Sequence, residues 1–376
     1  EGYLNIVNLG GTNYGVEAAA QYYWGISAKD LSVAQSALLA GLVQSPNTYD
    51  PTTHPDLARE RRDVVLGTML RDGKISQQEY DEAIASPIKL NVHPPEKGCS
   101  VAGESSFFCN YVVNYVALDE SFGATPEERL NLLNGFKLVS TLNPEAQKIA
   151  KQSVEAVQPG STNTNNVNAA LTSVEPGSGR VVAMAQNAEW GKPKDANDHS
   201  QTQFNFNVDS LYGGTPGFQP GSTFKPVVLS QWINSGRGVN AQIDGTALSY
   251  PSSFGWNARC VEGGKYYYRD SANGWSFKNA VPGYQTWGTV THGIRVSANS
   301  YLYSMVSKLD LCDISDMANK LHLHDGLGQQ LYDPGLLSAN IGGTRYGATP
   351  LTMASAYATF ASEGKYCEPR PLEKIT

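Results

Sequence analysis

The sequence predicts an α+β protein, because stretches with helical periodicity lie on both sides of a strand–turn–strand pattern. Residues 1 to about 90 are expected to be mostly helical, and further helices are expected at about 298–309 and 349–362. Between them, two strand-like runs at 169–174 and 180–185 are joined by Glu-Pro-Gly-Ser-Gly, which is typical of a hairpin turn. A chain of 376 residues is long enough for two domains, or for one large domain and a part of another.

The first helices have recognisable starts. One is expected to begin within 14–20, where small and apolar residues follow a Tyr-Gly pair. Ser27, with Asp30 three positions later, is predicted to cap the helix that follows, because a serine hydroxyl can accept a hydrogen bond from a free backbone N–H.

The next elements follow the same logic. A charged helix is expected from about 55 to 71, and Ser76 with Glu79 forms a capping box for another helix. Residues 91–140 are predicted to be a connector, after which Asn143, followed by proline, caps a clear helix that extends to about residue 157.

Composition excludes several classes of function. The formal charge of −7 and the lack of a basic stripe interleaved with aromatic residues argue against a nucleic-acid partner. No apolar run approaches the roughly 20 residues of a membrane span, and no signal peptide is visible. The 20 tyrosines, 37 glycines and 20 prolines suit a loop-rich extracytoplasmic protein. Since the chain starts at Glu1, a membrane anchor before it could have been left out.

The five cysteines predict no metal site. Cys99 and Cys109 flank a short Gly/Ser-rich loop whose ends could close into a disulfide. Cys260, Cys312 and Cys367 are expected to be buried thiols, the more frequent state of scattered cysteines. No Cys-x-x-Cys or histidine spacing suits zinc, and no cofactor is expected.

Ser222 and Lys225 form the strongest candidate catalytic pair. Pro220 and Gly221 predict a turn before them, and apolar residues at helical spacing follow, so the lysine lies one turn after the serine over the same face. A neighbouring amine can take the proton of a serine hydroxyl if burial lowers the lysine pKa. The pattern therefore predicts an activated serine nucleophile.

A second copy of this pattern, Ser86 to Lys89, competes with the first. Ser-x-x-Lys is expected by chance about once or twice in a chain of this length. There, however, a helix ends at Ser86 and an extended alternating stretch follows, so we interpret this copy as a helix exit.

Two sets of runs with characteristic spacing extend along the chain. The first set is Tyr3-Leu4-Asn5, Gly10, 14–19, 38–46 and 61–66, and the second is Thr141-Leu142-Asn143 with Gln147, 175–179, 220–226, Gly342-Gly343, 349–354 and 357–361. In this combination, which is specific, the whole chain resembles the class A penicillin-binding proteins, the bifunctional peptidoglycan synthases. The first set matches a late part of the family's glycosyltransferase domain, and the second matches motifs of its transpeptidase domain.

The family's second motif, Ser-x-Asn, has three candidates, which begin at Ser271, Ser297 and Ser338. Ser297 and Asn299 are preferred because a helical stripe follows them, as it does in the family. For the other two copies, a role in a turn is the default.

The resemblance implies three regions and a set of site residues. Residues 1–90 would be the C-terminal part of a glycosyltransferase domain, 91–140 a connector, and 141–376 a transpeptidase domain with helices on an antiparallel sheet. The catalytic residues would be Ser222, Lys225, Ser297 and Asn299, and the substrate-binding residues Gly221, Thr223 and Ala298.

Two departures from the family pattern stand out. The third motif, Lys-Thr-Gly, is absent, since its nearest candidate, Lys374-Ile375-Thr376, lacks the glycine. That strand carries part of the oxyanion hole in the family, so we expect the natural protein to continue beyond Thr376 and to complete a sheet whose edge is otherwise exposed. The family's catalytic glutamates would precede Glu1, and Glu17 matches a position that is not catalytic. This chain is therefore not expected to polymerise glycan.

The reaction implied is acyl transfer from the D-Ala-D-Ala end of a peptidoglycan stem peptide, with β-lactam antibiotics as inhibitors. Further partners implied are lipid-linked glycan strands and the cell-wall synthesis machinery, at the extracytoplasmic face of the bacterial plasma membrane. A serine β-lactamase or D,D-carboxypeptidase shares the first two motifs, but the glycosyltransferase-like first 90 residues argue against both. A non-catalytic penicillin-binding sensor or scaffold is the alternative from another class.

Overall fold

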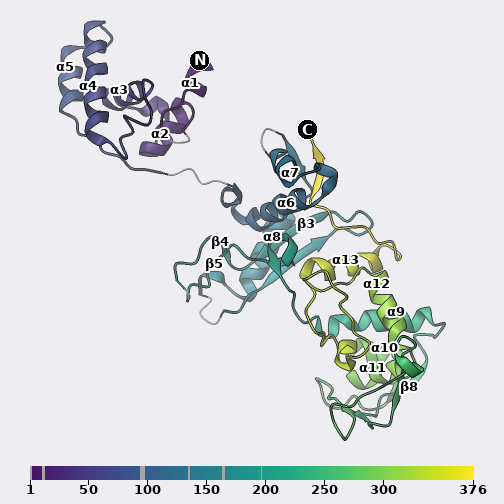
Figure 1. Ribbon diagram of the computed structural model, residues 1–376. Coiled ribbons are helices and arrows are strands. Elements are labelled where there is room, and N and C mark those ends of the chain that lie inside the picture. Colours follow the sequence, from purple (N-terminus) through teal and green to yellow (C-terminus); the bar gives the residue numbers. More distant parts are fainter. Residues whose placement is uncertain (1, 11–12, 94–97, 134–135, 163–165, 196) are drawn as a thin grey trace. The chain divides into compact units, whose positions relative to one another are not determined.

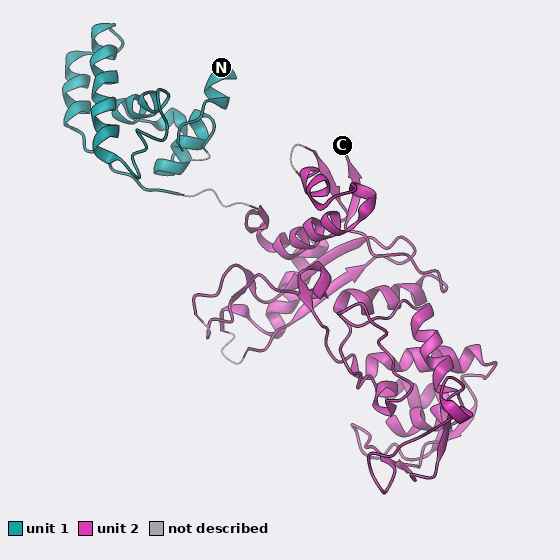
Figure 2. Cartoon of the chain, in the orientation of Figure 1, with its two compact units in different colours: residues 1–97 teal, residues 98–376 magenta. Residues whose placement is uncertain are grey.

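The computed structural model describes residues 2–10, 13–93, 98–133, 136–162, 166–195 and 197–376. The chain divides into two compact units, residues 1–97 and 98–376, which Figure 2 shows in teal and magenta. The mixture of helices and short strands confirms the predicted α+β class. The predicted connector includes 94–97 and 134–135, which lie outside the described residues, and its limits at 91 and 140 stay a prediction.

The first unit is helical, as expected. Its α-helices are α1 (Gly2–Ile6), α2 (Val16–Trp24), α3 (Val33–Leu42), α4 (Pro55–Arg71) and α5 (Gln77–Ala85) (Figure 1). Helices α3 and α4 pack along each other, and their apolar faces meet at Leu38, Ala58 and Leu66, which are at most 2% exposed. The helices therefore share a core of their own.

The helix caps of this unit test two predictions. The capping box is confirmed at α5, where the Ser76 hydroxyl accepts from the Glu79 N–H and the Glu79 carboxylate accepts from the Ser76 N–H. The prediction that Ser27 caps the helix after it was wrong, because Ser32 caps α3 and forms a capping box with Gln35. The Ser27 hydroxyl instead donates to the carboxylate of Glu17, in the first turn of α2.

The second unit holds the remaining helices and the strand pairs. Its α-helices are α6 (Ser106–Leu118), α7 (Pro126–Asn131), α8 (Pro144–Val157), α9 (Lys225–Asn234), α10 (Val290–Arg295), α11 (Asn299–Val306), α12 (Leu311–Lys320) and α13 (Pro350–Ala361). Its antiparallel strand pairs are β1 (Leu138–Ser140) with β14 (Leu372–Ile375), β2 (Ala170–Val174) with β3 (Val181–Gln186), β8 (Gln242–Asp244) with β13 (Trp287–Thr289), β9 (Ser249–Tyr250) with β12 (Trp275–Ser276), and β10 (Gly255–Asn257) with β11 (Lys265–Tyr267). Its parallel pairs are β4 (Glu189–Trp190) with β5 (Gln201–Thr202), and β6 (Asn205–Asp209) with β7 (Gly214–Thr215).

The predicted hairpin and the helix before it are both present and pack together. The Asn143 side chain accepts hydrogen bonds from the Glu145 and Ala146 N–H groups, which confirms it as the cap of α8. Helix α8 then lies on the β2–β3 hairpin (Figure 1), where Ala150 and Val154 meet alanines of β3. Local turn and cap chemistry therefore produced correct predictions here.

A larger core lies among helices α9, α11 and α12. Buried aromatic residues fill it, and the ring of Phe224 stacks on Tyr332 with centroids 5.6 Å apart. Trp256 and Tyr303, both at most 1% exposed, pack edge to face in the same cluster. The start of α9 is thus anchored by a ring buried in the core.

Two disulfides cross-link the second unit. Cys99 and Cys109 are bonded, as their loop allowed. Cys260 and Cys312 are also bonded, so the prediction that both are buried thiols was wrong. The fold brings the loop that carries Cys260 against the first turn of α12, a contact between residues 52 positions apart. Cys367 is a free thiol.

Candidate active site

The candidate nucleophile lies in a tight turn at the start of α9. Residues Gly221–Phe224 form a 3-10 turn that continues into the α-helix at Lys225. Phe224 is fully buried, whereas Ser222 is exposed. Among the described residues, none is hydrogen-bonded to the Ser222 hydroxyl, so this group is free to meet a substrate.

Close approach of two backbone segments shapes the turn. The Gly221 N–H donates to the Gly342 carbonyl over 3.2 Å. A Cβ atom at Gly342 would lie 2.1 Å from the Gly221 carbonyl oxygen, and Gly342 also has a φ of +76°. Only glycine fits at Gly342 without displacing the turn that carries Ser222.

Lys225 is buried at the first position of α9, one turn after Ser222. Its side chain is 2% exposed, and Nζ donates to the Ser297 carbonyl over 2.6 Å and to Ser297 Oγ over 3.0 Å. Burial lowers the pKa of Lys225 to about 8, because the charged ammonium is costly away from water. With this pKa, about a tenth of the amines are neutral at pH 7 and able to accept a proton.

Ser297 occupies the junction between α10 and α11 in an unusual backbone conformation. Its φ is +54°, in the left-handed region that residues other than glycine seldom adopt. The Ser297 and Ala298 N–H groups donate to Ile294 and Gly293, which ties the junction to α10. In this position Ser297 presents both its carbonyl and its hydroxyl to Lys225, so residues 72 positions apart meet.

The other predicted site residues lie close by but make different contacts. Asn299 Nδ2 donates to the Lys278 carbonyl over 2.7 Å, so this amide holds a neighbouring loop, and no bond joins it to Lys225 among the described residues. Ala298 is 3% exposed, with its N–H used within the protein. Thr223 Oγ1 donates to the Pro220 carbonyl over 2.5 Å, which closes the turn at Gly221.

The competing Ser-x-x-Lys copy has no such geometry. Ser86 is the residue after α5 and is extended, and its carbonyl accepts from Arg62 over 2.6 Å. The Lys89 carbonyl accepts from Trp24 Nε1, and the Lys89 side chain is exposed. This segment lines a cavity of about 240 Å³ in the first unit, but a cavity without a buried amine offers no base for a serine.

The rejected copies of the later motifs have structural contacts. The Ser271 hydroxyl accepts from the Asn273 N–H, and the Ser338 hydroxyl donates to the Gly343 carbonyl, as expected of turn residues. Lys374 lies on β14 opposite Val139 of β1. Glu17 accepts hydrogen bonds from the Ala28 N–H and from Gln21, both within the first unit.

Two contacts of the nucleophile turn were not predicted from the sequence. The Gln219 side chain pairs with the backbone of Thr344, and the Tyr357 hydroxyl donates to the Thr223 carbonyl. Both partners are more than 120 residues away from the turn, so no local pattern could reveal them.

In the described part of the chain, no cluster of His, Cys, Asp or Glu could hold a metal ion. No described helix combines the length and apolar character needed to span a bilayer.

Two family models match the chain, one after the other. The model described as Transglycosylase matches residues 1–70, and the penicillin binding protein transpeptidase domain matches residues 259–376. The second match includes Ser297 and Asn299 but begins after Ser222 and Lys225.

Curated relatives match along nearly the whole chain. Penicillin-binding protein 1A of Streptococcus pneumoniae is 28% identical over 380 residues, covering 99% of this chain and 47% of that protein. Penicillin-binding protein 2D of Bacillus subtilis is 26% identical, covering 100% of this chain and 48% of that protein. The chain thus spans about half the length of the curated relatives it matches.

A solved structure has the same fold. The crystal structure of penicillin-binding protein 1A from Haemophilus influenzae aligns with a TM-score of 0.62 and 19% identity, covering 100% of this chain and 62% of that one. The order of the two family models, the relatives along the full chain and the shared fold agree with one another. The chain belongs to the class A penicillin-binding proteins.

Proposed function

We propose that the second unit is a serine D,D-transpeptidase that cross-links peptidoglycan and is acylated by β-lactams. The observation that carries this proposal is the buried amine of Lys225, held 3.0 Å from Ser297 Oγ and one turn after the exposed Ser222. A buried lysine with a pKa of about 8 is suited to take a proton from a serine near neutral pH.

The first half of the reaction forms an acyl-enzyme. Neutral Lys225 takes the hydroxyl proton of Ser222 while Oγ attacks the carbonyl of the penultimate D-Ala. The resulting tetrahedral oxyanion is stabilised by backbone N–H groups, of which the one on Ser222 lies at the positive end of α9. Collapse breaks the peptide C–N bond, and the proton held by Lys225 passes through the Ser297 hydroxyl to the leaving D-Ala amine.

The second half transfers the acyl group. An amine of a neighbouring stem peptide attacks the ester and loses a proton to Lys225, again through Ser297. The C–O bond to Ser222 breaks and Oγ is reprotonated, so the enzyme is regenerated and a cross-link is formed. In a β-lactam the cleaved amide stays attached to the acyl group, so the serine ester persists.

The remaining predicted residues have supporting roles in this proposal. Gly221 and Thr223 would border the bound peptide on either side of Ser222. Asn299 would orient the peptide, a role that requires its amide to leave the Lys278 carbonyl when substrate binds. Ala298 would line the floor between Ser297 and Asn299.

For the whole protein, we propose glycan polymerisation as a second activity and attachment to the outer face of the bacterial plasma membrane. The transglycosylase match at residues 1–70 supports the first, and the relatives' names as penicillin-binding proteins support β-lactam recognition. Lipid-linked glycan strands, stem peptides and the cell-wall synthesis machinery are the expected partners.

Labelling with a fluorescent penicillin tests the nucleophile. We expect a label that survives denaturation and is lost in Ser222→Ala, whereas a folded protein that takes up no label would contradict the proposal and favour a non-catalytic module. A D-Ala-D-Ala pentapeptide, supplied with and without an acceptor amine, then tests the acceptor. Transfer to the amine is expected, and release of D-Ala by water alone would identify a carboxypeptidase.

A further inference from the structure

On the N-terminal side of Ser222, the side-chain amide of Gln219 holds the turn by pairing with a backbone, as a neighbouring strand would. Gln219 Nε2 donates to the Thr344 carbonyl over 2.7 Å, and Gln219 Oε1 accepts from the Thr344 N–H over 2.7 Å. The Thr344 hydroxyl lies 3.3 Å from Gln219 Oε1, but its closer acceptor is the Tyr346 carbonyl. One side chain thus satisfies both backbone groups of a residue that is 5% exposed.

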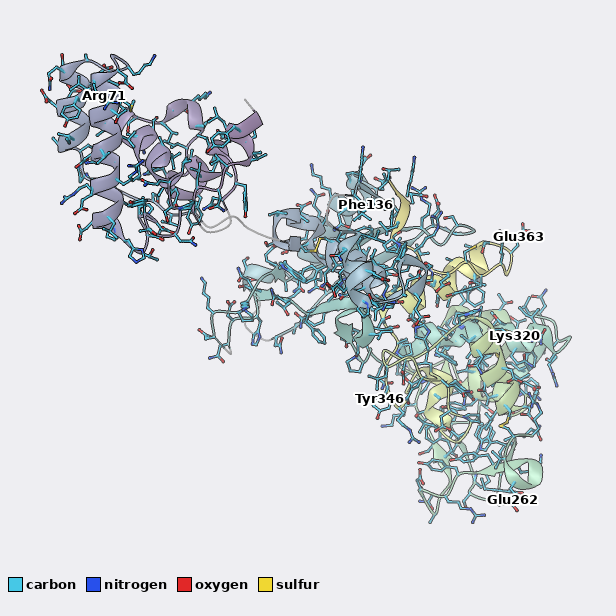
Figure 3. All side chains as sticks on the ribbon, turned by 45° about the horizontal axis from the view of Figure 1, so that its top comes forward. Arg71, Phe136, Glu262, Lys320, Tyr346 and Glu363 are labelled. Carbon is cyan, nitrogen blue, oxygen red and sulfur yellow. A yellow bond between two sulfur atoms is a disulfide. The ribbon has the colours of Figure 1, made fainter. Side chains whose placement is uncertain are left out.

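The backbone on either side of this amide is paired with the same distant segment. Phe218 and Ala348 exchange N–H to carbonyl bonds of 2.9 Å in both directions, and the Gly221 N–H donates to the Gly342 carbonyl. Residues 342–348 include the exposed Tyr346, labelled in Figure 3, and lead directly into α13. The turn that precedes Ser222 is therefore fixed to the approach to α13.

The side that follows the serine is held by α13 itself. Tyr357 Oη donates to the Thr223 carbonyl over 2.9 Å. Partial burial raises the pKa of Tyr357, so its hydroxyl keeps its proton and remains a donor at neutral pH. Since α13 packs on β2 and β6, this hydroxyl extends from a well-anchored element.

These contacts matter because the Ser222 side chain has no hydrogen bond of its own among the described residues. Ser222 is exposed, so the backbone of the turn determines where its Oγ lies. A displacement of about 1 Å in a reacting group can cost on the order of 100-fold in rate.

We propose that Gln219 and Tyr357 are positioning residues for the nucleophile, which hold the Ser222 turn from both sides over the buried Lys225. This inference rests on the proposed function, since it assigns these residues to the acylation of Ser222. In the described part of the chain neither side chain is hydrogen-bonded to Lys225 or Ser297, so both act through the backbone of the turn.

Gln219→Glu in the full-length protein provides the sharpest test. At neutral pH the glutamate carboxylate can still accept from the Thr344 N–H. It cannot donate to the Thr344 carbonyl, because an oxygen replaces the Nε2 of the glutamine. We expect the rate of acylation by fluorescent penicillin to fall about tenfold relative to wild type, as an unpaired buried acceptor implies. A protonated carboxyl restores the donor, so the ratio of variant to wild-type rate should recover as the pH falls toward about 4.5.

The matched controls separate positioning from stability. Gln219→Ala loses both bonds and should be slow with a ratio to wild type that does not change with pH. Tyr357→Phe should slow acylation without lowering Tm by more than a few degrees. The matched control is Tyr346→Phe, at an exposed tyrosine of the segment that leads to α13, and it should leave the rate unchanged. Melting curves at each pH show whether a variant is folded, and Tyr357→Phe keeps the test decisive if Gln219→Glu does not fold.

The outcomes distinguish the inference from the function on which it rests. If wild type is labelled and Ser222→Ala is not, but Gln219→Glu and Tyr357→Phe both acylate at the wild-type rate, the positioning role is overturned and the transpeptidase proposal stands. A rate ratio of Gln219→Glu that does not change with pH also overturns it. If wild type takes up no label, or Ser222→Ala is labelled equally, the proposed function itself is wrong.

Discussion

Two copies of the four-residue pattern Ser-x-x-Lys, one at Ser86 in the first unit and one at Ser222 in the second, have different structures. In the first unit, Ser86 follows the end of α5, the chain is extended, and the lysine is exposed. In the second unit, Ser222 precedes α9, the chain coils, and Lys225 is buried against Ser297. Helical spacing places the lysine one turn after the serine, and burial lowers the proton affinity of its amine.

In the proposed function, the chemistry would therefore come from the surroundings of the motif. A serine and a lysine become a nucleophile and a base only when the fold removes the lysine from water and supplies an acceptor for its protons. In the second unit that acceptor is a residue 72 positions away, held with a left-handed backbone at the junction of two helices. The comparison can be tested by changing each member of both pairs.

The largest effect is expected for the two serines. Ser222→Ala should abolish covalent labelling by fluorescent penicillin, because it removes the exposed hydroxyl that lies one turn before the buried Lys225. Ser86→Ala, the matched change in the first unit, should leave labelling intact. Labelling that persists in Ser222→Ala and disappears in Ser86→Ala would reverse the assignment of the two units.

The lysines should give the next largest effect. Lys225→Met removes the base and should slow acylation roughly 10²–10⁴-fold, the usual contribution of general base catalysis, while Lys89→Met should have no effect. In wild type the acylation rate should rise with pH and level off above about 8, where Lys225 is neutral. Stopped-flow acylation between pH 6 and 9 measures this, and a flat profile would argue against Lys225 as the base.

Local interactions explain what could be predicted from the sequence. The caps at Asn143 and Ser76, the hairpin turn, and the helix exit at Ser86 all depend on residues within about four positions, and all were predicted correctly. The contact of Lys225 with Ser297 was expected only through the resemblance to a known family, since their separation leaves no periodic signal.

Long-range contacts explain what could not be predicted. The disulfide between Cys260 and Cys312 depends on how a loop folds over α12. The pairing of Gln219 with Thr344 depends on two loops meeting across 125 residues. In both cases the residue types were visible in the sequence, but a glutamine or a cysteine has many equivalent partners until the fold selects one.

The burial of Lys225 should also make the stability of the protein depend on pH. The ordinary pKa of lysine is 10.5, and that of Lys225 in the folded protein is about 8. Between pH 8 and 10.5, Lys225 is therefore mostly protonated in the unfolded chain and mostly neutral in the folded protein. The cost of the buried charge is therefore complete below pH 8 and is lost as the pH rises to 10.5. Wild type should gain up to about 3 kcal/mol relative to Lys225→Met over this interval. Urea unfolding of wild type and of Lys225→Met at pH 7.5 and 10.5 measures the change.

The smallest effect concerns Ser27 and Ser32, two serines that precede α3. They are the same residue type and differ only in the groups to which they are hydrogen-bonded. Ser32 accepts a hydrogen bond from the Gln35 N–H at the start of the helix, whereas Ser27 donates to an exposed glutamate. Ser32→Ala should therefore lower the free energy of unfolding of the first unit by about 1 kcal/mol, the usual value of a helix cap. Ser27→Ala should cost about 0.5 kcal/mol or less, because its hydrogen bond is exposed to water. Urea unfolding followed by circular dichroism compares them, and a larger loss in Ser27→Ala would restore the cap that the sequence alone suggested.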